Sequence, residues 1–252
     1  MSYVYFRLPH STHVFRNRLS TEPEEIASLA ELNGRRGFVI APFTPSDDCP
    51  ILLLPTDWEE AKLNFSGDNQ NGEQTYLSSN DGVSAMLLDA DYEKERQRYA
   101  VDFHNYHGQL TNDAFQKIVL ARCARLTATE KLSPLTLFAR ACHRYPRMFV
   151  ALFSTERSGT WLVATPETLI SGTNGAMQTM ALAGTMRLSG ANLDFDVEGG
   201  SIGKDDIRWS TKNIKEQRYV ETYITECVEQ FSDDVNVEGP FTVRAGDLVH
   251  LR

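Results

Sequence analysis

The sequence has 252 residues, of which 41% are apolar and 23% charged, and its formal net charge at pH 7 is −9. This composition is typical of a globular protein with a substantial core, and the acidic balance leaves no basic face for a nucleic acid. No apolar run is long enough to span a bilayer, and the N-terminus has no signal-peptide pattern. We therefore expect a cytoplasmic protein without nucleic-acid or membrane partners. The cysteines lack zinc-type spacing and are expected to be reduced thiols: Cys49, Cys123, Cys142 and Cys227.

The first half of the chain combines short strands with one long helix. Apolar runs closed by proline predict buried strands at 37–43 and 51–55. Residues 67–82 are rich in Asn, Gly and Ser, which is typical of a loop. Residues 91–110 have few helix breakers and predict a helix. The β-branched and apolar residues of 116–126 predict a strand.

A second helix has clear signals at both ends. Ser133 is a suitable N-cap, Pro134 suits the first helical position, and Pro146 ends the helix. Its apolar residues recur at helical spacing and predict a buried stripe: Phe138, Ala141, Cys142 and Tyr145.

Strands follow this helix. Residues 148–154 and 160–164 predict a hairpin, and 177–183 predicts a further strand. Residues 186–206 are glycine-rich and acidic, so we expect a long loop there.

The end of the chain carries the strongest helix prediction, at 207–231, and two short strands, at 241–243 and 248–252. The strands occur singly and in hairpins between three helices, without regular βαβ alternation. We therefore expect an α+β fold with mixed, largely antiparallel sheets and helices packed outside.

Glu216 lies on the expected inward face of the helix at 207–231. The apolar residues of that face are Val220, Tyr223, Cys227 and Phe231. A buried carboxylate is costly unless it is paired, protonated or bound to a metal, so Glu216 is a candidate site residue. The alternative is that Glu216 lies near the helix start and reaches solvent.

Two further residues could carry acid–base chemistry. Lys117 opens the strand predicted at 116–126. It is either an ordinary surface lysine or a base, and as a base it needs burial to disfavour its charged form. Thr165, Pro166 and Glu167 follow a strand directly and match a helix start. A glutamate favoured by the helix dipole would be enough to explain that pattern.

An apparent calcium motif is rejected. Asp194, Asp196 and Glu198 resemble the opening of a calcium-binding loop. However, Ser201 and Asp205 stand where such a loop needs an apolar residue and a glutamate. No phosphate-binding glycine loop and no Ser/His/Asp or Cys/His arrangement is apparent.

Five segments, taken in order, resemble the chorismate-utilising enzymes and among them the isochorismate synthases. They are KIVLAR at 117–122, ATPETL at 164–169, TMALAGT at 179–185, KNIKEQRYV at 212–220 and VHL at 249–251. The resemblance makes 91–252 the N-terminal portion of the chorismate-binding catalytic domain. Residues 1–90 resemble the variable N-terminal part of a short isochorismate synthase. The implied fold is one intertwined α+β domain, here incomplete at the C-terminus.

The resemblance also implies roles for individual residues. Lys117 matches the general base that activates water for attack on C2 of chorismate, and Glu167 matches the general acid that protonates the departing C4 hydroxyl. A helix N-terminus at Glu167 would favour its charged form, which conflicts with that role. Glu216 matches a ligand of the cofactor Mg²⁺. The residues that match the lining of the chorismate pocket are Ala183, Gly184, Thr185 and His250. We expect the two catalytic residues, the metal ligand and His250 to converge on one cavity.

Two positions indicate water as the nucleophile. Anthranilate and aminodeoxychorismate synthases carry Gln where this chain has Lys117, and the latter carry Lys where it has Ala183. The resemblance therefore implies an isochorismate synthase that feeds menaquinone or catechol siderophore synthesis and is a monomer at full length. Salicylate synthases share both features and remain the alternative.

The chain departs from the family in two respects. Gln217 stands where the family usually has His. The family segments that follow VHL are absent, namely a Pro-Thr-Pro loop, further Mg²⁺-binding glutamates and an arginine that clamps a substrate carboxylate. We therefore expect a truncated chain that is inactive by itself. A non-catalytic remnant is the second interpretation.

Overall fold

The computed structural model describes residues 2–19, 21–55, 58–62, 86–88, 92–128, 132–173, 175–188 and 207–252. The chain divides into two compact units, one of Met1–Ser78 with Pro134–Arg252 and one of Ser79–Ser133. The loop predicted at 67–82, most of the loop predicted at 186–206 and the rejected calcium pattern lie outside the described residues. No helix in the described part of the chain is long and apolar enough to cross a membrane.

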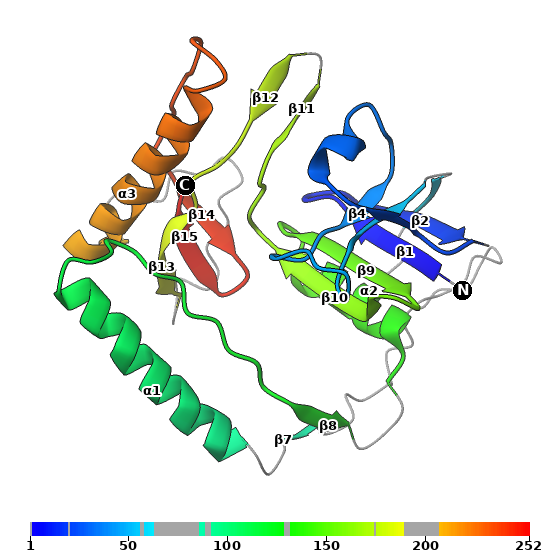
Figure 1. Cartoon of the computed structure of the whole chain (residues 1–252), viewed down its shortest axis with the longest axis horizontal. Helices are drawn as coiled ribbons and strands as arrows, with labels where there is room; N and C mark the ends of the chain where they lie inside the picture. The colour runs from blue at the N-terminus through cyan, green and yellow to red at the C-terminus, as the bar shows by residue number, and fades with distance from the viewer. Residues whose placement is uncertain are drawn as a thin grey trace. The chain divides into compact units, whose positions relative to one another are not determined.

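A five-stranded sheet forms the core of the first unit (Figure 1). Its order is β10 (Gly159–Thr165), β9 (Phe149–Thr155), β1 (Ser2–Arg7), β2 (His13–Leu19) and β6 (Glu59–Lys62), with every neighbour antiparallel. The predicted hairpin at 148–164 is confirmed as β9 and β10. Because β9 pairs with β1, the N-terminal strand shares a sheet with residues about 150 positions away.

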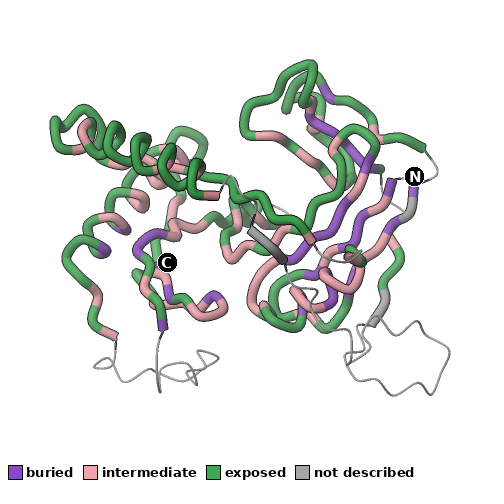
Figure 2. The backbone as a smooth tube through the Cα atoms, turned by 90° about the horizontal axis from the view of Figure 1, so that it is seen from below, coloured by how far each residue is buried: buried purple, intermediate pink, exposed green. Residues whose placement is uncertain are grey.

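Helix α2 (Pro134–Arg144) covers one face of this sheet. Phe138 and Cys142 pack against Tyr5, Val150 and Leu152, so the predicted helix and its apolar stripe are confirmed. The opposite face packs on β5 (Ile51–Leu54), whose Leu52 and Leu54 join a second cluster. Figure 2 shows the buried residues gathered in the strands around the N-terminus.

A three-stranded sheet orders β3 (Glu24–Ile26), β5 and β4 (Phe38–Ile40), with a short 3-10 helix at Leu29–Leu32. The strands predicted at 37–43 and 51–55 are therefore confirmed, with shorter bounds. All four residues of β5 are buried, since the strand has apolar contacts on both faces.

Helix α3 (Thr211–Val228) packs against a second three-stranded sheet, ordered β13 (Ala183–Arg187), β15 (Leu248–Leu251) and β14 (Thr242–Ala245) (Figure 1). Strands β11 (Ser171–Thr173) and β12 (Ala176–Gln178) form a separate two-stranded ribbon. The predicted single strand at 177–183 is wrong in extent, because residues 179–182 lie between β12 and β13 outside any strand.

The buried face of α3 also differs from the prediction. Its buried residues are Asn213 and Gln217, whereas Tyr223 is 60% exposed and Phe231, beyond the helix end, is 91% exposed. The amphipathic pattern did not identify this face, because the helix contacts its sheet through polar side chains near its N-terminus.

The second unit contains α1 (Tyr92–Thr111), β7 (Met86–Leu88) and β8 (Leu126–Ala128). The helix predicted at 91–110 is confirmed. The strand predicted at 116–126 is wrong, because residues 112–125 belong to no strand. Instead, the segment returns along the helix, where the Arg122 guanidinium lies 5.3 Å from the Tyr92 ring centre and 5.8 Å from that of Tyr99. A high β propensity forms a strand only where a partner strand is available.

All strand pairs among the described elements are antiparallel, and α2 and α3 each cover a sheet. The expected α+β class with largely antiparallel sheets is therefore confirmed.

Candidate active site

Strands β13 and β15 bring together the four residues predicted to line a substrate pocket. Ala183 pairs with Leu251 and Thr185 pairs with His250, and a bulge at Gly184 separates the two pairs. The Thr185 hydroxyl lies 3.0 Å from Nδ1 of His250. Ala183, Gly184, Thr185 and His250 are therefore neighbours on one antiparallel ladder.

Gly184 allows this strand to approach α3 closely. Its φ of +61° lies in the left-handed region, which side chains disfavour. A Cβ at this position would lie 3.1 Å from the carbonyl oxygen of Asn213 and 3.3 Å from its Cβ. Glycine is thus required both by the backbone conformation of the bulge and by the packing of α3.

Because of the bulge, the Ala183–Leu251 pair and the Thr185–His250 pair lie on opposite faces of the sheet. Leu251 lies against α3, near Gly184 and Asn213. Because successive strand residues alternate between faces, His250 and its partner Thr185 point to the other face. His250 is half-buried, and this burial lowers the pKa of its imidazole below the ordinary value of 6.5. At neutral pH the ring is therefore uncharged.

Gln217 connects α3 to the strand that carries these residues. Its Oε1 accepts a hydrogen bond from the Ala183 N–H at 2.9 Å, and its Nε2 donates to the Ala181 carbonyl at 2.9 Å. Only 2% of Gln217 is exposed. The sequence prediction assigned it no role. Two signals pointed to it: the exchange of the family's His for Gln, and its position four residues after Asn213 on one helix face.

Glu216 precedes Gln217 on α3 and is half-buried. Hard divalent cations prefer several oxygen ligands. Within the part of the chain that the structure describes, no group of three His, Cys, Asp or Glu side chains could hold a metal ion. Glu216 by itself therefore does not make a Mg²⁺ site.

Glu167 follows β10, which ends at Thr165. No helix starts there, so the predicted helix start is wrong. The Glu167 N–H instead donates to Oγ1 of Thr165 at 3.2 Å, which closes a local turn. The side chain is exposed. Glu167 is therefore not exposed to a helix dipole that would favour its charged form, so this objection to a role as proton donor does not apply.

Lys117 lies in the second unit, in the irregular segment that follows α1, and is half-buried. The other candidate residues belong to the first unit. Their convergence with Lys117 on one cavity stays a prediction.

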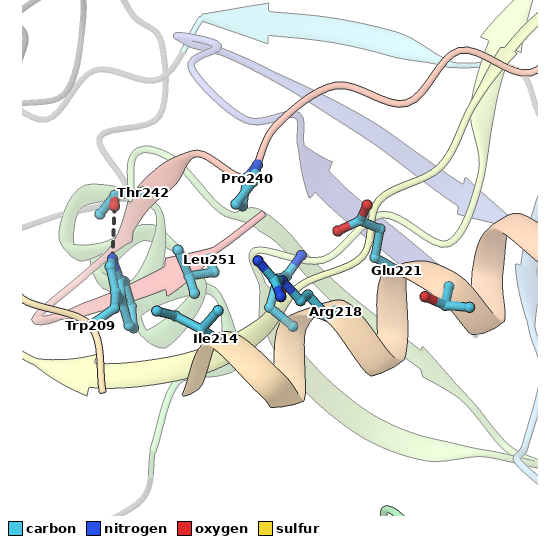
Figure 3. Close-up of a pocket in the computed structure, with 9 residues that line it drawn as sticks. Trp209, Ile214, Arg218, Glu221, Pro240, Thr242 and Leu251 are labelled. Atoms are coloured by element: carbon cyan, nitrogen blue, oxygen red, sulfur yellow. Dashed lines mark hydrogen bonds between the residues drawn. The ribbon is translucent and has the colours of Figure 1, made fainter. Parts of the chain in front are cut away.

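A cavity of about 560 Å³ lies along α3 and the edge of its sheet (Figure 3). Its lining includes Ile214, Arg218 and Glu221 of the helix and Leu251 of β15. At one end, Nε1 of Trp209 donates to the Thr242 hydroxyl at 3.0 Å. Since Leu251 faces α3 and His250 does not, this cavity and the Thr185–His250 pair lie on different faces of the sheet.

Comparisons with known proteins agree with this fold. A structure assigned as the 2,3-dihydroxybenzoate-specific isochorismate synthase DhbC of Bacillus anthracis superimposes with a TM-score of 0.67 at 14% identity, over 99% of this chain and 66% of that one. MenF, the menaquinone-specific isochorismate synthase of Escherichia coli, gives a TM-score of 0.64 at 16% identity, over 100% and 63%. The chain thus spans about two thirds of the length of each. No curated protein sequence matches it.

The family model of the chorismate binding enzymes matches residues 56–252. This match covers well over half of the sequence and includes all five segments that carry the resemblance. The chain belongs to the chorismate binding enzyme family.

Proposed function

We propose that the protein is an isochorismate synthase, which adds water at C2 of chorismate and releases the C4 hydroxyl. The observation that carries the proposal is the Thr185–His250 pair on the β13–β15 ladder. When the Thr185 hydroxyl donates to Nδ1, the neutral ring carries its proton on Nε2, which can donate to a substrate oxygen. A lowered His250 pKa favours that neutral form.

Two further residues support water as the nucleophile. Lys117 stands where anthranilate and aminodeoxychorismate synthases carry Gln, and Ala183 stands where aminodeoxychorismate synthases carry Lys. In the proposed reaction, the water oxygen bonds to C2 and its proton passes to Lys117. The C4–O bond breaks as Glu167 gives a proton to the leaving hydroxyl, which departs as water. One proton is taken and one is given, so the reaction balances.

Mg²⁺ belongs to the proposal with Glu216 as its one assigned ligand. The described residues do not complete a ligand set for it. The metal would neutralise the ring carboxylate of the substrate. The proposal also includes a cytoplasmic location and a role in menaquinone or catechol siderophore synthesis.

Product analysis tests the proposal. The protein, as its gene encodes it, is incubated with chorismate and Mg²⁺, and the products are separated by chromatography. Isochorismate alone is the expected product. Salicylate with pyruvate would assign the chain to the salicylate synthases instead. A folded protein that binds chorismate but forms neither product would favour a non-catalytic remnant.

A further inference from the structure

The Gln217 carboxamide takes the place of one residue of a neighbouring strand. It bonds the N–H of residue 183 and the carbonyl of residue 181 on the same edge of the segment, each at 2.9 Å. A residue in a parallel ladder bonds the neighbouring strand in the same pattern. Its N–H donates to the carbonyl of one residue, and its carbonyl accepts from the N–H of the residue two positions later. Gln217 thus pairs with the backbone at the start of β13.

This pairing lies directly before the bulge at Gly184. A shift of one residue in strand register exchanges the faces to which side chains point. The bulge is the feature that allows Ala183 to face α3 while Thr185 pairs with His250. A bond that holds Ala181 and Ala183 against α3 therefore fixes where the bulge forms and which side chain meets His250.

The chemistry of the contact requires a carboxamide. The Gln side chain offers a hydrogen-bond acceptor and a donor together. A carboxylate offers acceptors only, and the thioether of Met is at most a weak acceptor. Since Gln217 is 2% exposed, water cannot replace a lost partner. A buried N–H or carbonyl without a partner is disfavoured, so the segment would move to restore its bonds.

We propose that Gln217 is a positioning residue of the substrate site: its carboxamide fixes the register of β13 and so holds Thr185 opposite His250. The identity of the substrate rests on the proposed function, but the backbone contact does not.

Amide hydrogen exchange of the protein as its gene encodes it, with chorismate binding measured in parallel, tests this proposal. Gln217→Met preserves size and removes both bonds. We expect the Ala183 amide to exchange about a hundredfold faster. The Kd for chorismate should rise about tenfold, since the Thr185–His250 pair is no longer held. Amides of β9, in the five-stranded sheet, should keep their protection.

Two variants complete the experiment. Gln217→Glu keeps the acceptor for Ala183 and loses the donor to Ala181, so Ala183 should stay protected while the Kd rises to an intermediate value. Gln230→Met removes an exposed Gln whose side chain donates to the Glu226 carbonyl four residues earlier, and neither property should change.

Each remaining outcome gives a decision. Unchanged Ala183 exchange in Gln217→Met, or an equal loss of protection in β9 and β13, would overturn the positioning role. If Gln217→Met does not fold, loss of Ala183 protection in Gln217→Glu overturns it. A wild-type protein that binds no chorismate refutes the proposed function, while the Ala183 exchange data still decide the role of Gln217.

Discussion

The side chains with proposed chemical roles differ in how firmly their surroundings hold them. His250 is half-buried and its ring lies within hydrogen-bond distance of Thr185, whereas the Glu167 side chain is exposed. A neutral imidazole suits hydrogen bonding to a substrate. The proton donor role of Glu167 requires that bound substrate remove water from around its carboxyl group.

Removing either proposed acid–base residue should slow turnover strongly in the protein as its gene encodes it. Lys117→Ala and Glu167→Gln should each lower kcat by about 10²- to 10⁴-fold, because each eliminates one proton transfer. Steady-state assays of isochorismate formation measure this. Lys94→Ala and Glu156→Gln, at exposed positions on α1 and in the β9–β10 turn, are the matched controls. A Lys117→Ala enzyme with unchanged kcat would exclude Lys117 as the base.

The lowered pKa of His250 makes stability depend on pH. Between the folded-state pKa and 6.5, the unfolded chain binds more protons than the folded chain, so stability falls as the pH is lowered through this range. His250→Gln removes this contribution. Denaturation at pH 7.5 and at about pH 5.5 should therefore show a larger loss for the wild type than for the variant. Equal losses would contradict the assignment.

At the scale of elements, the packing of α3 on β13 depends on one glycine. Gly184→Ala should destabilise the protein by about 1 kcal/mol for its positive φ, and further because its Cβ would press on Asn213. Gly34→Ala is the matched control, since its φ is +72° and no described atom beyond its two chain neighbours lies within 4 Å of the added Cβ. Urea denaturation measures the difference. Equal losses at the two sites would show that the Asn213 contact adds nothing.

The two helices of the first unit should respond differently to loss of an aromatic side chain. Phe138 of α2 is 3% exposed in the core, so Phe138→Ala should lower the free energy of unfolding by about 3–5 kcal/mol. Tyr223 of α3 is 60% exposed, and Tyr223→Ala should change it by less than about 0.5 kcal/mol. The same denaturation experiment measures both. A large loss at Tyr223 would mean that this face of α3 is covered in solution.

At the scale of the molecule, Arg7 joins segments that are distant in sequence. Its buried guanidinium donates to the carbonyls of Pro146, Tyr145 and Met148 at 2.6, 2.6 and 2.7 Å. These bonds hold the end of α2 against β1, about 140 residues earlier in the chain. The dipoles of these three backbone carbonyls thus stabilise the buried charge.

Arg7→Met should therefore cost about 3 kcal/mol, because it leaves three carbonyls without their donor. Arg98→Met is the control, since Arg98 forms an exposed ion pair with Glu95 on the same helix. Thermal unfolding of both variants measures the effect. A melting temperature for Arg7→Met equal to that of the control would show that solvent replaces these bonds.

The sequence by itself determined the elements whose signals are local. The ends of α2 follow from Ser133, Pro134 and Pro146, and the β9–β10 hairpin follows from two apolar runs around a short turn. Capping, proline and helical periodicity act within a few residues, so they can be read without the fold. The family segments likewise predicted Ala183, Thr185 and His250 as pocket residues; the structure brings them onto one ladder, and their role in a substrate pocket stays a prediction.

Only the tertiary structure decided which faces and which backbone groups meet. The strand predicted at 116–126 did not form, the buried face of α3 proved to be Asn213 and Gln217, and no helix starts at Glu167. Each of these outcomes depends on a partner that lies far along the chain. Gln217 bonds residues 34 and 36 positions earlier. Hydrogen bonds and packing across such separations depend on the whole fold, which local propensity does not encode.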